Sequence, residues 1–209
     1  TRRLAFWGTL ALMRCVGSSP AAAASALTNR LSGIANIDTI EPTIFDAEDG
    51  LLDESDIEPA TASESNEECA ALESLIAQAH SLDERRDDDP KVRRLQAELR
   101  PLLKYSVKQV IFCRFITTAE AVGAALRKAW PKAKVEVVTG TLTPDERRAR
   151  VDALEPFENR ILVATDCLSE GINLQSLFDT GVHYDLSWNP TRHQQREGRL
   201  CRGDRRSRP

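Results

Sequence analysis

Residues 109–166 read QVIFCRFITTAEAVGAALRKAWPKAKVEVVTGTLTPDERRARVDALEPFENRILVATD. The short apolar run at 110–112 has the composition of a strand buried on both faces of a sheet, and further strands are predicted at 135–138 and 161–164. Two segments between them open with a Thr three residues before a Glu, the pattern of a helix capping box, at Thr117–Glu120 and Thr143–Glu146. A fourth strand is predicted at 182–184. This alternation predicts right-handed βαβ units and an α/β fold with a parallel sheet flanked by helices.

Polar residues come directly after the predicted strands. In sheets of this type, function collects at the carboxyl ends of the strands. The residues in those positions are Arg114, Thr139, Gly140, Thr165, Asp166 and Asp185. We therefore expect the functional surface at this edge of the sheet.

The segment after the fourth strand carries an arginine pattern. Gln195, Arg199 and Arg202 are spaced i, i+4, i+7, so they share one face of a helix. Two guanidiniums on one face suit a triphosphate, because each offers a planar fork of donors to phosphate oxygens. Gly198 would remove a side chain where another surface approaches closely. A basic surface helix with solvated arginines explains this spacing equally well when the segment is taken alone.

The segment SEGINL, residues 169–174, follows the third predicted strand directly. Gly171 permits a tight turn that brings backbone N–H groups near a phosphate. An ordinary turn that contains a glycine is the alternative, both here and at Thr139–Gly140. Cys113 and Cys167 lie beside buried strands, where cysteine acts as a small apolar residue rather than a nucleophile.

Four segments in order resemble motifs IV, IVa, V and VI of the C-terminal RecA-like lobe of superfamily 2 helicases, closest to the Snf2 (SWI2/SNF2) ATPases. They are QVIFCRF (109–115), VTGTLTPDERR (138–148), ATDCLSEGINLQ (164–175) and DLSWNPTRHQQREGRLCR (185–202). One such motif carries little weight, whereas four in order at normal spacing are specific. The start of the chain, TRRLAFWGTLALMRCVGSSPAAAASAL, resembles the helical segment before this lobe in bacterial Snf2-like proteins, including DISARM-type anti-phage helicases.

The resemblance implies a role for each matching residue. Arg199 and Arg202 would act as arginine fingers toward ATP, with Gln195 beside them. The implied nucleotide-binding residues are Glu170, Gly171, Asn173 and Gly198. The implied nucleic-acid-binding residues are Arg114, Thr139, Gly140, Thr165 and Ser169. No metal ligand is implied in this chain.

A complete motor also needs a phosphate-binding loop, G-x-x-x-x-G-K-[ST], and an acidic pair for Mg²⁺. Neither pattern occurs in the sequence. In the family that it resembles, both lie in an N-terminal RecA-like lobe, which would hold ATP and Mg²⁺ and be the partner of this lobe. We expect the isolated chain to hydrolyse no ATP. Snf2-type proteins continue R-x-G-Q after the second finger, whereas Arg202 runs into GDRRSRP, so we expect a truncated or frame-shifted end.

The formal net charge of −4 hides a strong segregation. Residues 31–84 hold 15 acidic residues and no Lys or Arg, whereas the chain after them is basic. We divide the chain into a helical lead-in (1–35), an acidic flexible linker (36–68), helices (69–104) and the RecA-like lobe (105–209). An acidic mimic of nucleic acid that occupies a basic groove is the alternative interpretation of the linker.

The first 31 residues allow two interpretations. Arg2-Arg3, an apolar run and a stretch of alanines imitate a secretory signal. The favoured interpretation is a helix over 4–16 and a second helix, capped by Ser19 with Pro20 in its first turn, that runs to Leu31. Five scattered cysteines without a CxxC pair are typical of an intracellular protein, and no run of 18 apolar residues occurs. We expect a cytoplasmic chain without membrane contact.

Two functions from different classes remain. The leading hypothesis is the C-terminal motor lobe of an ATP-dependent, Snf2-like helicase or translocase that acts on double-stranded DNA through phosphate contacts. The alternative is a non-catalytic RecA-like module that binds nucleic acid or protein.

Overall fold

The computed structural model describes residues 2–32, 66–169, 172, 174–186, 194, 196–198 and 200. A four-stranded parallel sheet lies at its centre, formed by β1 (Gln109–Phe112), β2 (Lys134–Val138), β3 (Arg160–Ala164) and β4 (Thr180–His183). The strand order is β2-β3-β1-β4, and Val110 of β1 lies opposite Leu162 of β3 and Gly181 of β4. The predicted parallel sheet and its four strands are confirmed.

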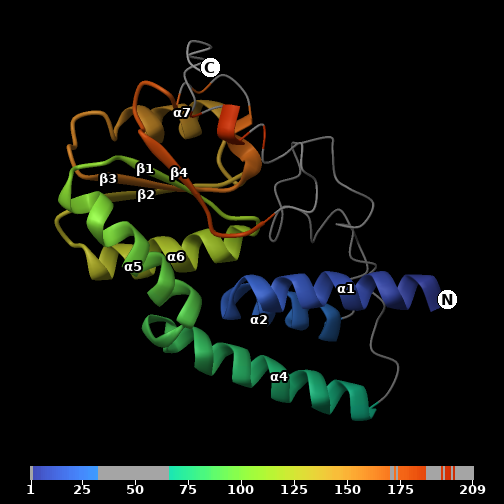
Figure 1. The fold of residues 1–209 in the computed structure, drawn as a ribbon. Helices are drawn as coiled ribbons and strands as arrows, with labels where there is room; N and C mark the ends of the chain where they lie inside the picture. The colour runs from blue at the N-terminus through green and yellow to red at the C-terminus, as the bar shows by residue number, and fades with distance from the viewer. Residues whose placement is uncertain are drawn as a thin grey trace, which may run out of the picture.

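Helices cover both faces of this sheet (Figure 1). On one face lie α5 (Pro90–Lys104) and α6 (Ile116–Ala129), whose Leu99 and Leu126 pack with Ile111 and Val163. On the other face lie α7 (Pro144–Asp152) and the turns after β3. There Val151, Leu174 and Phe178 pack with Val110 and Leu162. Successive residues of β1 and β3 therefore enter opposite cores, which explains why both strands are continuously apolar.

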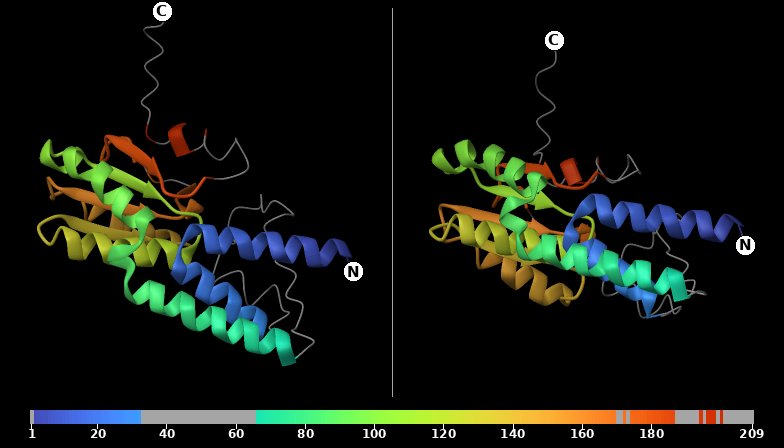
Figure 2. Two further views of the ribbon diagram at one scale, coloured as in Figure 1. Left: turned by 60° about the horizontal axis from the view of Figure 1, so that its bottom comes forward. Right: turned by 90° about the horizontal axis from the view of Figure 1, so that it is seen from below.

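Three further helices form a layer beside the carboxyl ends of the strands (Figures 1 and 2). They are α1 (Arg2–Ser18), α2 (Pro20–Leu31) and α4 (Asn66–Glu84). The predicted break between the first two is confirmed: the Ser19 side chain caps α2 by accepting from the Ala22 N–H, with Pro20 in the first turn. Small residues let α2 approach α4 closely, and Arg30 pairs with Glu68 at 2.8 Å. No helix in the described ranges is long and apolar enough to cross a membrane.

The two predicted capping boxes have different outcomes. At α7 both hydrogen bonds form: Thr143 Oγ1 accepts from the Glu146 N–H, and Glu146 accepts from the Thr143 N–H, which lowers the pKa of Glu146. At α6 the prediction is wrong, because the helix begins at Ile116 with Phe115 as its N-cap and no side-chain cap. Phe115 and Ile116 are buried, so their packing sets the start of α6 ahead of the threonines. Within the described residues the buried Thr117 hydroxyl has no partner.

The predicted boundaries of the remaining helices need small corrections. The α4 helix begins at Asn66, inside the range assigned to the acidic linker. Residues 36–65 of that range, and residues 33–35 of the predicted lead-in, lie outside the described residues. The α7 helix ends at Asp152, two residues before the predicted Leu154, and the chain turns there so that Leu154 is buried in the core.

Gly123 lies where α6 packs closely on β2. A Cβ at this position would come within 2.3 Å of Val137 Cγ2, and valine cannot turn away easily because its χ1 is stiff. We expect Gly123→Ala to lower the free energy of unfolding by about 1–3 kcal/mol, measured by urea unfolding. Val137→Ala in the same chain should restore part of that loss. A double variant less stable than the sum of the two single effects would contradict this explanation.

Candidate nucleotide and nucleic-acid site

Arg196 is the most deeply buried charged side chain in the described part of the chain, with 1% exposure. It lies at the carboxyl edge of the sheet, where its Nε donates to Asp166 Oδ1 at 2.7 Å. Its Nη1 donates to the Asp185 carbonyl oxygen at 3.2 Å and lies 3.3 Å from His183 Nδ1. The guanidinium also lies 5.4 Å from the centre of the Phe112 ring. One side chain thus joins the ends of β1, β3 and β4 to the helical turn at 196–198.

Sequence reasoning missed Arg196. It placed Gln195 and Arg199 on one helix face, and residue 196 stands about 100° around the helix from residue 195. An arginine on that adjoining helix face, one residue after the glutamine, could have been considered as a side chain that binds the helix to the edge of the sheet. The buried partner Asp166 had been placed at the sheet edge without a role.

Asp185 is a second centre of polar contacts at this edge. Its Oδ2 accepts from the Ser18 hydroxyl at 2.9 Å and from the Arg114 N–H at 3.0 Å. Its Oδ1 accepts from Lys91 Nζ at 2.7 Å. Because the side chain is 7% exposed, the carboxylate is satisfied almost entirely by the protein. These bonds join α1 and α5 to the ends of β1 and β4.

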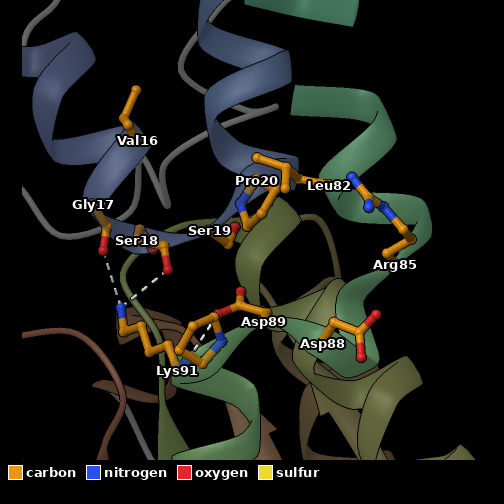
Figure 3. Close-up of a pocket in the computed structure, with 11 residues that line it drawn as sticks. Val16, Gly17, Ser18, Ser19, Pro20, Leu82, Arg85, Asp88, Asp89 and Lys91 are labelled. Carbon is orange, nitrogen blue, oxygen red and sulfur yellow. Dashed lines mark hydrogen bonds between the residues drawn. The ribbon is translucent and has the colours of Figure 1, made fainter. Parts of the chain in front are cut away.

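Lys91 holds the end of α1 in place (Figure 3). Its Nζ donates to the carbonyl oxygens of Gly17 at 3.3 Å and Ser18 at 3.0 Å. A cation is stabilising at a helix C-terminus, where carbonyl groups are left without intrahelical partners. Ser18 and Ser19 also bond to the Thr118 hydroxyl at 2.8 and 2.7 Å. The turn between α1 and α2 is therefore fixed to the edge of the sheet that the sequence marked as functional.

The structure brings the predicted nucleic-acid-binding residues to this edge with different exposures. Arg114 is partly exposed and lines a cavity, and Gly140 is also partly exposed. The Thr139 side chain is buried, and its hydroxyl bonds to that of Thr141 at 2.8 Å. Thr165 is fully buried, and its hydroxyl donates to Cys167 Sγ at 3.4 Å. Ser169 ends the short helix η2 (Asp166–Ser169). Their contacts with nucleic acid stay predictions.

Arg147 supports the loop at Gly140. Its two terminal nitrogens donate to the carbonyl oxygens of Cys167 at 3.1 Å and Gly140 at 3.2 Å. The side chain is 4% exposed, so this guanidinium fixes the loop after β2 against the loop after β3. The ends of these two strands are therefore held in one arrangement.

Most predicted nucleotide-site residues lie outside the described residues: Gln195, Arg199, Arg202, Glu170, Gly171 and Asn173. Gly198 is described and exposed, and its carbonyl oxygen accepts from Gln175 Nε2 at 3.0 Å. A Cβ at Gly198 would meet nothing within 4 Å, so the close approach expected there is not made by the described chain.

The cysteines at this edge are buried. Burial, followed by the charge of Asp185, raises the pKa of the Cys113 thiol well above its usual value. A thiol in that state is a poor nucleophile, which supports the interpretation of Cys113 as a small apolar residue.

These features define a class: a parallel α/β lobe whose polar residues gather at the carboxyl edge beside a helix-borne arginine. Residues 90–204 match the family described as helicase conserved C-terminal domain. The match covers more than half of the chain, so the chain belongs to this family.

Curated relatives match over the same region. The chain is 33% identical over 96 residues to the ATP-dependent RNA helicase dbp8 of Aspergillus clavatus, covering 46% of this chain and 18% of that protein. It is 35% identical over 96 residues to the ATP-dependent RNA helicase DbpA of Escherichia coli K12, covering 44% of this chain and 20% of that protein. The matched region is therefore no more than about a fifth of these relatives.

A solved structure resembles the fold over most of the chain. The C-terminal part of the Fun30 ATPase domain matches with a TM-score of 0.51 and 20% identity, covering 90% of this chain and 65% of that chain. At this identity the likeness shows the RecA-like fold alone.

Proposed function

We propose that this chain is the C-terminal motor lobe of an ATP-dependent, Snf2-like translocase that acts on double-stranded DNA. Membership of the helicase family supports the coarse assignment. The observation that carries the proposal is the buried Arg196 anchor, which holds the 196–198 turn against the ends of three strands. Arg199 and Arg202 follow this anchor in the sequence, so they would extend from a rigid base toward a nucleotide on a facing lobe.

The donor groups at this edge fit a lobe that supplies cations rather than one that holds a metal. The two buried carboxylates, Asp166 and Asp185, are already paired with Arg196 and Lys91. In the described part of the chain, no group of three or more His, Cys, Asp or Glu side chains is arranged to hold a metal ion. The pairing of both carboxylates supports the proposal that ATP and Mg²⁺ are held mainly by an N-terminal RecA-like lobe.

Each candidate site residue of this chain would contact either the nucleotide or the nucleic-acid backbone. Arg199 and Arg202 would neutralise charge that develops on the transferred group, and Gln195 would help to position it. Glu170, Gly171, Asn173 and Gly198 would border the nucleotide. Arg114, Thr139, Gly140, Thr165 and Ser169 would follow the nucleic-acid backbone, where contacts give salt-sensitive affinity without sequence preference.

An RNA substrate is the second candidate, because the curated relatives that match this chain are named RNA helicases. The Snf2-like motifs SEGINLQ and WNPTRHQQREGRLCR favour DNA.

Nucleic-acid stimulation of ATP hydrolysis separates these proposals. The 209-residue chain would be joined to a lobe that carries the phosphate-binding loop, and steady-state hydrolysis would be measured alone and with duplex or single-stranded DNA or RNA. We expect duplex DNA to stimulate hydrolysis at least about tenfold and RNA to stimulate it less. Stronger stimulation by RNA would assign the RNA candidate. No stimulation of ATP hydrolysis by any nucleic acid would contradict the proposal that the chain is a motor lobe, and would favour a non-catalytic binding module.

A further inference from the structure

A network of buried hydroxyl groups joins the helical layer to the carboxyl edge of the sheet. Ser19 Oγ lies 2.7 Å from Thr118 Oγ1, which lies 2.8 Å from Ser18 Oγ. The Ser18 hydroxyl donates to Asp185 Oδ2 at 2.9 Å. All four residues are buried, with at most 7% exposure. Figure 3 shows Ser18 and Ser19 in the turn between α1 and α2. We call the three hydroxyl groups of Ser19, Thr118 and Ser18 the hydroxyl network.

Each hydroxyl carries one hydrogen, and this fixes the direction of every bond in the network. Ser18 gives its hydrogen to Asp185, so Thr118 is the donor at the contact between Thr118 and Ser18. The Ser19 hydroxyl then donates to Thr118, while Ser19 Oγ accepts from the Ala22 N–H at 3.1 Å. All the hydrogens therefore point from the positive N-terminus of α2 toward the carboxylate. Hydrogen bonds aligned in this way polarise and strengthen one another.

Asp185 connects this network to the arginine anchor. Its carboxylate accepts from Ser18 and from Lys91, whereas its main-chain carbonyl oxygen accepts from Arg196 Nη1 at 3.2 Å. The helical layer thus holds the side chain of the residue whose main chain Arg196 binds. A shift of the Ser18 turn would move Asp185, and with it a contact that fixes residues 196–198 to the sheet.

We propose that the hydroxyl network, by holding Asp185, positions the 196–198 turn and Arg199, which follows this turn in the sequence. Its members are positioning residues for ATP hydrolysis, and this catalytic consequence rests on the proposed function, which gives Arg199 its role. Ser18 and Ser19 lie outside the region of the family match, so that match assigns them no role. A misplacement of about 1 Å can cost about 10²-fold in rate, so a small shift at Asp185 would affect hydrolysis.

Amide hydrogen exchange in the 209-residue chain tests this link without ATP or a second lobe. Thr118→Val keeps the shape of the side chain and removes the hydroxyl from the middle of the network. We expect a peptide that contains residues 196–198 to exchange about two- to tenfold faster in this variant, because the support of its anchor loses a hydrogen bond. Thr118→Ser retains a hydroxyl and should restore wild-type exchange.

Thr28→Val is the matched control for the exchange measurement. It removes a hydroxyl of the same helical layer that donates within α2, to the Ala24 carbonyl oxygen at 2.8 Å. Exchange of the peptide that contains residues 196–198 should therefore stay at the wild-type rate. A purely local effect of Thr118→Val would raise exchange at the starts of α2 and α6 and leave the 196–198 peptide unchanged.

ATP hydrolysis by the motor formed by joining this chain to a phosphate-loop lobe tests the catalytic consequence. Thr118→Val should lower kcat about tenfold and leave the KM for ATP near its wild-type value. In the Arg199→Ala background the same change should lower kcat no further, because it acts through that arginine. A role of Thr118 in stability alone would lower kcat by the same factor in both backgrounds.

Wild-type exchange of the 196–198 peptide in Thr118→Val and in Ser18→Ala would overturn the proposal. Ser18→Ala opens the network at a second point and leaves the bonds from Lys91 and from the Arg114 N–H to Asp185 in place. It therefore decides the question if the urea curve shows that Thr118→Val does not fold. Faster exchange with wild-type kcat would contradict the positioning role in hydrolysis. Wild-type kcat in Arg199→Ala would instead contradict the proposed function, and the exchange measurement would still decide whether the network holds the turn.

Discussion

Arg196→Ala is expected to lower the free energy of unfolding of the chain by about 3–5 kcal/mol, measured by urea denaturation. The guanidinium is 1% exposed and lies 2.7 Å from Asp166, whose side chain is also buried. Removing it leaves a carboxylate without its counter-ion in a region of low dielectric, where that loss is most costly. The same change removes the bond to the Asp185 carbonyl oxygen and the contact with Phe112.

A matched surface arginine gives the control. Arg94 pairs with Glu98 at 2.5 Å on α5, and the arginine side chain is 79% exposed. Arg94→Ala should therefore cost less than about 1 kcal/mol, because water screens that pair. The double variant Arg196→Ala with Asp166→Asn should cost less than the sum of the single effects, because the two groups interact directly. Similar losses of the free energy of unfolding for Arg196→Ala and Arg94→Ala would contradict the role of Arg196 as a structural anchor.

The sheet was predictable because its signals are local. The continuous apolar runs at 110–112 and 161–164 are typical of strands that enter a core on each face, and the structure has them in two cores. Ser19 caps α2, as predicted from Pro20 beside it, and Thr143 and Glu146 form a capping box at α7, as predicted from their spacing of three residues. In each case the interacting groups are close neighbours in the chain.

The network at the carboxyl edge was not predictable, because its partners are distant in the chain. Ser18 and Asp185 are 167 residues apart, and Lys91 and Asp185 are 94 apart. No local pattern pairs such residues, although the position of Asp185 after a strand marked the edge to search. The error at α6 has the same origin: Thr118 bonds to the turn between α1 and α2, and buried apolar residues fix the helix start. Tertiary contacts there override the local capping signal.

Arg199→Ala is expected to lower kcat for ATP hydrolysis by about 10³- to 10⁵-fold in the motor formed by joining this chain to a phosphate-loop lobe. The proposed role of Arg199 is to stabilise charge that develops on the transferred phosphoryl group. That interaction is strongest in the transition state, so kcat should fall far more than the KM for ATP rises. Steady-state hydrolysis at saturating nucleic acid measures both constants, and Arg94→Ala should leave both near their wild-type values.

Comparing Arg196→Ala with Arg199→Ala distinguishes a role in catalysis from a role in holding the fold together. Arg196→Ala should lower both stability and kcat, because it removes the contacts that hold the 196–198 turn to the sheet. Arg199→Ala should lower kcat and leave the urea midpoint near the wild-type value, since its proposed partner is a nucleotide on another lobe. A wild-type kcat in Arg199→Ala would exclude the proposed role of Arg199 as an arginine finger. A loss of kcat matched by an equal loss of stability would instead assign Arg199 to the fold, and the catalytic proposal would then pass to Arg202.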